Sequence, residues 1–154
     1  MKKSEYKNLR SNAQKMMRFF SNNSCQTPCG AKISSSSAHI LLLLLKMKDE
    51  VVNQQVLAKE LGLNKSSIAR SCTELEENGH LKIDSHQEDR RSNVIVLTSK
   101  GIKLARKLED QGDAFFTSVL KNIPSEKVDV ILESIEIFVK ALEVASKNEG
   151  NREK

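Results

Sequence analysis

The chain of 154 residues has the length of one domain with a few additional helices, and a hydrophobic fraction of 38% is enough for a packed core. Its longest apolar run, Ile40 to Leu45, is far shorter than the roughly 20 residues that cross a bilayer, and no signal peptide precedes it, so we expect a cytoplasmic protein. The net charge of +5 suits a polyanionic partner. Residues 33–100, however, balance at nine basic and nine acidic residues, so a polyanion-binding segment there must have its basic side chains on one face.

The first predicted helix covers residues 4–21. Its apolar residues recur at steps of three and four, as on one face of a helix, and are Tyr6, Leu9, Ala13, Met16, Met17 and Phe20. Residues 21–32 then break the pattern with Asn-Asn-Ser, Thr-Pro and Cys-Gly steps, which are typical of a loop.

A cluster of three short helices is predicted next. Ser34 to Ser37 offer N-caps for a helix that reaches about Lys48, and its run Leu41–Leu45 should form the buried centre. A helix over Gln54–Leu61 should end at Gly62 in a left-handed cap. Asn64 can cap the third helix, Lys65–Asn78, which ends before Gly79.

Two strands and two long helices complete the chain. Strands are predicted at Leu81–Ser85 and Val94–Thr98, with a polar hairpin tip between them. Helices should follow over Ser99–Leu120 and over 125–147, because Ile123-Pro124 separates them and Ser125 can cap the second. The apolar stripe of the last helix consists of Val128, Ile131, Leu132, Ile135, Phe138, Val139 and Leu142.

The helices around Gly62 followed by a basic hairpin predict a winged helix-turn-helix. In that motif the second helix places its N-terminal residues on base edges in the major groove. The inward stripe of this helix should contain Ile68, Cys72 and Leu75, and the residues expected on or beside its exposed side are Lys65, Ser66, Ser67, Arg70 and Ser71. Arg90 and Arg91 at the hairpin tip suit the negative potential of a narrow minor groove. Each piece alone is also common on an ordinary solvated surface, so the prediction depends on their contiguous order.

Residues 33–101 resemble the MarR family of bacterial and archaeal transcription regulators. The resemblance is carried by VLAKELGLNKSSIARSCTELEENGHLK and by EDRRSNVIVLTSKG, in which an Asp-x-Arg wing precedes a strand ending Leu-Thr-x-x-Gly. It implies a mainly α protein with a small β-hairpin wing, a homodimer and a near-palindromic DNA operator. It also implies that Ser66, Ser67 and Arg70 face bases, that Arg91 enters the minor groove, and that Asp89 orients the wing arginines. Repression is the commoner mode of regulation in this family.

We therefore expect four segments: an N-terminal dimerisation helix and loop (1–32), the winged helix-turn-helix (33–101), C-terminal dimerisation helices (102–147) and a disordered tail (148–154). The two apolar stripes at the chain ends need partners, and a second copy of the chain can supply them. Packing of the stripes within one chain is the alternative.

The residues leave open three kinds of signal that could regulate the protein. Cys25 and Cys29, four apart in a predicted loop, could form a redox-sensitive disulfide, although no neighbouring His lowers a thiol pKa. The same two thiols with His39 and one carboxylate from Glu109, Asp110 or Asp113 could bind zinc. A small amphipathic ligand between the reading domain and the dimer helices is the third alternative, and Cys72 is expected in the core.

No catalytic constellation is present in the sequence. The remaining histidines, His80 and His86, lie beside and within the hairpin, and no phosphate-binding glycine loop appears, so we expect no enzyme and no required cofactor. The competing function is a winged-helix module that binds a protein and has no specific affinity for DNA. The two functions differ in salt dependence, because counterion release makes DNA binding fall log-linearly with salt.

Overall fold

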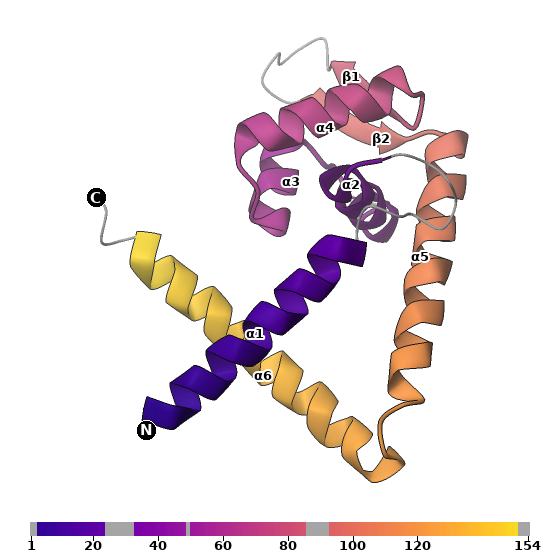
Figure 1. The fold of residues 1–154 in the computed structure, drawn as a ribbon. Coiled ribbons are helices and arrows are strands. Elements are labelled where there is room, and N and C mark those ends of the chain that lie inside the picture. The colour runs from indigo at the N-terminus through magenta and orange to yellow at the C-terminus, as the bar shows by residue number, and fades with distance from the viewer. Residues whose placement is uncertain (1–2, 24–32, 49, 86–92, 151–154) are drawn as a thin grey trace. The chain divides into compact units, whose positions relative to one another are not determined.

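The computed structural model describes residues 3–23, 33–48, 50–85 and 93–150 (Figure 1). Its elements are, in chain order, α1 (Lys3–Asn23), α2 (Ser35–Lys46), α3 (Gln54–Leu61), α4 (Lys65–Glu77), β1 (Leu81–Ser85), β2 (Asn93–Leu97), α5 (Ser99–Leu120) and α6 (Ser125–Gly150). The chain divides into two compact units, residues 1–111 and 112–154. The predicted class, mainly α with a β-hairpin wing, is confirmed.

Side-chain caps begin the three short helices. The Ser34 hydroxyl accepts a hydrogen bond from the Ser37 amide at 3.1 Å and begins α2. The Asn53 side chain accepts from two amides of α3, and the Asn64 side chain accepts from the Ser67 amide at 2.8 Å. Each bond satisfies a donor that a helix N-terminus leaves free, and the predicted cap at Asn64 is confirmed.

Two glycines end the helices of the helix-turn-helix. Gly62 after α3 has φ +62°, and Gly79 after α4 has φ +70°. At the end of α4 the His80 amide donates to the Leu75 carbonyl and the Gly79 amide donates to the Glu76 carbonyl, both at 2.8 Å. This pair of bonds defines a Schellman motif, in which the left-handed residue favours glycine. The predicted left-handed cap at Gly62 is also confirmed.

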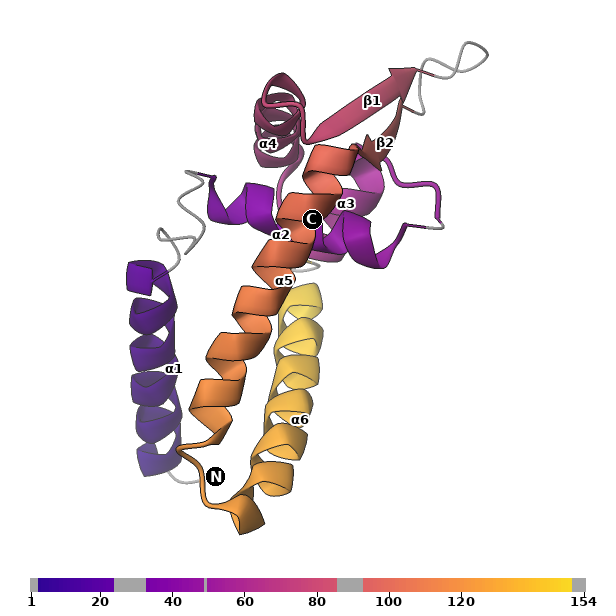
Figure 2. The ribbon, with the colours of Figure 1, turned by 90° about the vertical axis from the view of Figure 1, so that its right-hand side faces the viewer.

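The core of the first unit lies where α2, α3, α4 and the hairpin meet, and Figure 2 shows β1 beside α4. Its fully buried members include Ile40 and Leu41 of α2, Leu57 of α3 and Ile68 of α4. The remaining buried apolar residues are Leu44, Val52, Cys72, Leu75, Leu81, Ile95 and Ala105. In the run Leu41–Leu45, Leu41 and Leu44 are buried while the other three are half-buried, so the run is less uniformly enclosed than predicted.

The hairpin is antiparallel, with Ile83 opposite Ile95. The Ile95 amide also donates to the Val52 carbonyl at 2.8 Å, which connects the wing to the segment before α3. The second strand covers Asn93–Leu97, one residue earlier than the predicted Val94–Thr98, because Thr98 caps α5 instead of continuing the ladder. Helix ends also differ from the predictions by one to three residues. The helix α1 covers Lys3–Asn23, α2 stops at Lys46, α4 stops at Glu77, and α6 continues to Gly150.

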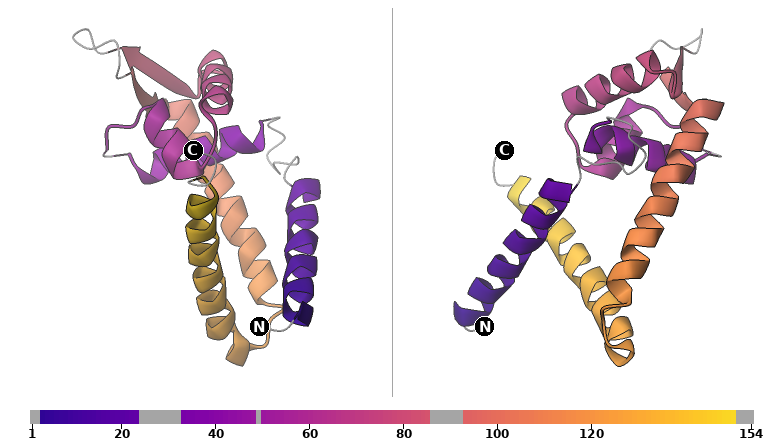
Figure 3. Two further views of the ribbon diagram at one scale, coloured as in Figure 1. Left: turned by 90° about the vertical axis from the view of Figure 1, so that its left-hand side faces the viewer. Right: turned by 45° about the vertical axis from the view of Figure 1, so that its right-hand side comes forward.

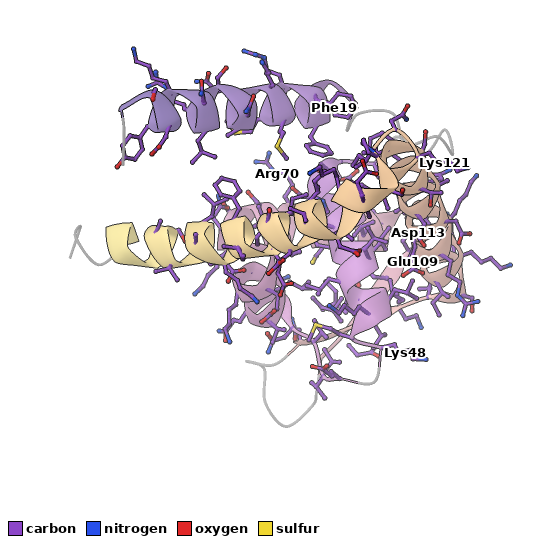
Figure 4. All side chains as sticks on the ribbon, turned by 90° about the horizontal axis from the view of Figure 1, so that it is seen from below. Phe19, Lys48, Arg70, Glu109, Asp113 and Lys121 are labelled. Atoms are coloured by element: carbon purple, nitrogen blue, oxygen red, sulfur yellow. The ribbon has the colours of Figure 1, made fainter. Side chains whose placement is uncertain are left out.

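The terminal helices expose apolar side chains in the single chain. Figure 4 shows these side chains as sticks along α1 and α6, and Figure 3 gives two further views of the ribbon. On α1 the exposed set includes Tyr6, Leu9, Met16, Met17 and Phe20, and on α6 it includes Leu132, Ile135, Val139 and Leu142. These members of the predicted stripes are therefore exposed, whereas Ala13, Val128, Ile131 and Phe138 are half-buried. No helix among the described residues is both long and apolar enough to cross a membrane.

Candidate functional site

The outer face of α4 is the candidate site. Lys65, Ser66 and Arg70 are exposed and Ser67 is half-buried, as the helical spacing predicts. Arg70 is labelled in Figure 4. These residues lie in the first two turns of the helix, where short hydroxyl side chains allow close approach to a ligand and Arg70 offers a planar set of donors. The arrangement suits hydrogen bonding to a polar surface.

Ser71 does not belong to this face. Its exposed fraction is 6%, so the predicted position on or beside the exposed side of the helix is wrong. Ser71 lies next to Cys72 on α4, which packs against α2, α3 and β1, and packing within the unit buries it. The exposed candidate set is therefore Lys65, Ser66, Ser67 and Arg70.

The N-terminus of α4 is ordered by its own side chains. The Ser66 hydroxyl donates to Oδ1 of Asn64 at 2.8 Å, and the same oxygen accepts from the Ser67 amide. Asn64 thereby fixes the first turn, while the Ser66 oxygen still has acceptor capacity. The amides ahead of Ser67 have no partner within the helix, and the positive end of the helix dipole lies here, which favours an anion such as a phosphate.

The second half of α4 is acidic and serves the fold. Glu74 accepts a hydrogen bond from the Ser37 hydroxyl at 3.2 Å, and Glu76 accepts from the Ile83 amide at 3.0 Å. Glu77 adds a third carboxylate to this half of the helix. Because these charges repel a polyanion, the polyanion-binding part of α4 is confined to its first turns.

Thr73 is a member of the exposed face that the sequence analysis did not single out. It is exposed and lies seven positions after Ser66, which places both on one side of the helix. Its hydroxyl donates to the Ala69 carbonyl at 3.0 Å, so its methyl group is free to face outward. The helical spacing from Ser66 was the signal that could have identified it.

Several predicted site residues lie outside the described part of the chain. These are Asp89, Arg90 and Arg91 of the wing tip, and Cys25 and Cys29 of the proposed sensor. His39 is exposed on α2. Within the described ranges no three His, Cys, Asp or Glu side chains are grouped as a metal site. The redox and zinc hypotheses, which both depend on the two cysteines, stay predictions.

Cys72 is buried in the core, as predicted. Burial, together with the negative charge of Glu76, raises the pKa of its thiol from 9.0 to about 11. Near neutral pH the thiolate, which is the reactive form, is therefore about a hundredfold scarcer than for an ordinary cysteine.

We expect slow alkylation of Cys72 in the folded protein. In a chain carrying Cys25→Ser and Cys29→Ser, iodoacetamide at pH 8 should modify Cys72 at least about a hundredfold more slowly than in the same chain unfolded in urea. Mass spectrometry of timed samples gives both rates. Similar rates in the two states would contradict the inert, buried thiol.

A cavity of about 200 Å³ lies within the first unit between α2, β2 and α5. Its walls include the apolar side chains of Leu44, Ile95, Leu97 and Ile102. Lys48, Glu50 and Arg106 contribute charged groups to its lining. A cavity lined by both apolar side chains and a few charged groups suits a small amphipathic molecule.

The helix α4 forms a winged helix-turn-helix together with the preceding helix α3 and the β1–β2 hairpin. A family model described as MarR family matches residues 32–92. The chain is 28% identical over 116 residues to an uncharacterised HTH-type transcriptional regulator, YfiV, of Bacillus subtilis strain 168, covering 75% of this chain and 72% of that protein. Residues 32–92 of this chain are thus similar to the MarR family, a class of transcriptional regulators.

Solved structures share the fold. The structure of Streptococcus pneumoniae FabT in complex with DNA is similar with a TM-score of 0.77 at 19% identity, covering 91% of this chain and 99% of that one. A MarR transcriptional regulator from Methanosarcina mazei Go1 is similar with a TM-score of 0.72 at 23% identity, covering 90% and 99% of the two chains. The winged helix-turn-helix fold of this chain is thus found in proteins of widely different sequence.

Proposed function

We propose that this chain is a cytoplasmic, sequence-specific DNA-binding regulator that binds a near-palindromic operator as a homodimer and acts without catalysis. The observation that carries the proposal is the outer face of α4. Its first turns present Lys65, Ser66 and Arg70 to solvent, while its acidic half is committed to contacts with α2 and β1. This polarity matches a recognition helix that enters the major groove by its N-terminus.

Direct readout of a base suits Arg70. A guanidinium can donate two hydrogen bonds to O6 and N7 of guanine, whereas the serine hydroxyls can contact several bases or a phosphate. Arg90 and Arg91, which the sequence places at the wing tip, would add minor-groove contacts with Asp89 orienting them. A protein of similar fold, FabT of Streptococcus pneumoniae, has been solved in complex with DNA, which supports DNA binding by this fold.

A homodimer accounts for the apolar faces of α1 and α6. Exposed apolar side chains such as Leu9 and Met16 on α1 and Ile135 on α6 would be costly in a free monomer. A second copy of the chain buries them with two-fold symmetry, which also provides two recognition helices for the two halves of a palindrome.

The protein would repress transcription while no signal is present, and a signal would release it from DNA. The cavity between α2, β2 and α5 could receive an amphipathic effector, because it adjoins both the wing strand β2 and α5. Oxidation of Cys25 and Cys29, and zinc binding by these thiols with His39, are the other two signals to be tested. Parallel binding assays with peroxide, thiol, zinc and chelator distinguish them.

A salt titration tests the central proposal against the protein-interaction alternative. Wild-type protein is used to select duplexes from a randomised pool, and the affinity for the enriched duplex is measured from 50 to 300 mM KCl. A log-linear loss of affinity with salt is expected, because phosphate contacts release counterions. Failure to enrich any duplex would overturn the proposal in favour of the protein-binding module.

Replacing Arg70 by Ala should weaken binding to the selected duplex by about 1–3 kcal/mol and reduce its advantage over random DNA, as for a lost base contact. Fluorescence anisotropy with both duplexes measures the ratio. Lys103→Ala, which removes another exposed cation, from α5, is the matched control and should leave the ratio unchanged. An unchanged ratio for Arg70→Ala would show that the recognition face has been assigned wrongly.

A further inference from the structure

The end of α4 and the beginning of α5 meet at a hydrogen-bonded joint. The residues that form it are Asn78, Gly79 and His80 on one side and Thr98, Lys100 and Gly101 on the other. The two sides are separated by the whole hairpin in sequence. All six residues belong to the first unit and to the described part of the chain.

Thr98 is the centre of this joint. Its hydroxyl oxygen accepts a hydrogen bond from the Gly101 amide at 3.0 Å and thus caps the N-terminus of α5. The same hydroxyl donates to the Gly79 carbonyl at 2.7 Å, and the Thr98 amide donates to the His80 carbonyl at 3.1 Å. One side chain therefore caps α5 and holds the turn that ends α4.

Lys100 and Gly101 tighten the same contact. Nζ of Lys100 donates to the carbonyl of Asn78, the C-cap residue of α4, at 2.8 Å. Gly101 packs so closely that a Cβ added there would lie 1.8 Å from the His80 carbonyl oxygen. Any larger residue would have to push the two helices apart, so the closeness of this approach requires glycine.

His80 contributes its side chain to the joint as well as its carbonyl group. Nδ1 of His80 is buried and has no hydrogen-bond partner among the described residues. Burial, assisted by the charge of Lys100, lowers the pKa of His80 from its ordinary value and so favours the neutral imidazole. A neutral ring avoids a second positive charge beside Lys100.

The geometry points to Thr98 as a positioning residue that fixes the direction of the recognition helix α4 relative to α5. This inference rests on the proposed function. The helix α5 is continuous from Ser99 to Leu120 and so connects the reading unit to the C-terminal unit. In a dimer held together by its terminal helices, the joint would set how far apart the two recognition helices lie, and hence which half-site spacing the protein accepts.

A series of operator spacings tests the role of Thr98. The duplex selected by wild-type protein is remade with one or two base pairs inserted or deleted between its half-sites, and affinities are measured for wild type, Thr98→Val and Thr98→Ser. Valine keeps the shape of the side chain but loses the hydroxyl, whereas serine keeps the hydroxyl. Thermal melting followed by circular dichroism reports how far each variant is folded.

For Thr98→Val we expect about a three- to tenfold loss of affinity on the original spacing, the size typical of lost hydrogen bonds, with a smaller loss on the shifted spacings. The ratio of affinities between spacings thus becomes flatter, and Thr98→Ser restores it. A purely structural role would lower the active fraction equally for every duplex and would leave the ratio unchanged.

Lys100→Met provides a second variant that removes one exposed contact of the joint without altering the cap of α5. It should flatten the spacing ratio in the same direction. If wild type prefers one spacing and both Thr98→Val and Lys100→Met retain that preference, the positioning role is overturned while DNA binding stands. If wild type enriches no duplex at all, the proposed function itself fails, and the role of Thr98 in DNA reading fails with it.

Discussion

Replacing Ile135 by Glu should dissociate the proposed dimer into monomers. Ile135 is 48% exposed in the single chain and lies in the middle of the apolar stripe of α6. In a two-fold dimer the change places a carboxylate in the interface twice, and each buried, unpaired charge costs several kcal/mol. We expect the dimer dissociation constant to rise at least about a hundredfold, which corresponds to about 2.7 kcal/mol. Sedimentation equilibrium over a concentration series measures it.

The loss of DNA binding should follow the loss of the dimer. A monomer contacts one half-site, so it forfeits the effective concentration that the linked second reader provides, which is worth about 10²-fold or more. Glutamate favours helix, so α6 itself should persist and circular dichroism should change little. Lys140→Ala is the matched control, because it removes only an exposed ion pair with Glu136 on the other side of α6. A dimeric Ile135→Glu protein would refute the assignment of this face to the interface.

The elements of the first unit could be predicted because their signals are local. Asn64 caps the residues directly after it, Gly62 and Gly79 mark helix ends, and the inward residues of α4 follow the helical period. The exposed positions of Lys65, Ser66 and Arg70 follow from the same periodicity. A short-range pattern is sufficient for these features, since each depends on neighbours within about one turn.

Ser71 and Thr98 could not be placed correctly because their environments are formed by distant parts of the chain. Ser71 lies at the edge of the inward stripe, and it is buried because other elements of the unit pack against α4. Thr98 continues an alternating apolar pattern and so resembled a strand residue, yet its hydroxyl contacts a carbonyl nineteen positions earlier. Glu74 is a similar case, because its partner Ser37 belongs to another helix.

The helix-turn-helix fold and the proposed DNA-binding face both depend on α4. Ile68 lies on the inner side of α4 with an exposed fraction of 0%, between Ser67 and Arg70 of the candidate site. Replacing Ile68 by Ala removes buried methyl groups and leaves a cavity, while alanine itself favours the helix. The free energy of unfolding should therefore fall by about 2–5 kcal/mol.

Urea unfolding followed by circular dichroism measures this loss. Thr73→Ala on the exposed side of the same helix is the matched control, and it should change stability by no more than about 0.5 kcal/mol. Because Ile68 does not touch the DNA-facing surface, the folded fraction of Ile68→Ala should keep the ratio of affinities for selected and random duplexes. A variant that is less stable but keeps this ratio of affinities would show that Ile68 stabilises α4 and does not contribute to sequence recognition. A loss below about 1 kcal/mol would contradict the tightly packed core around Ile68.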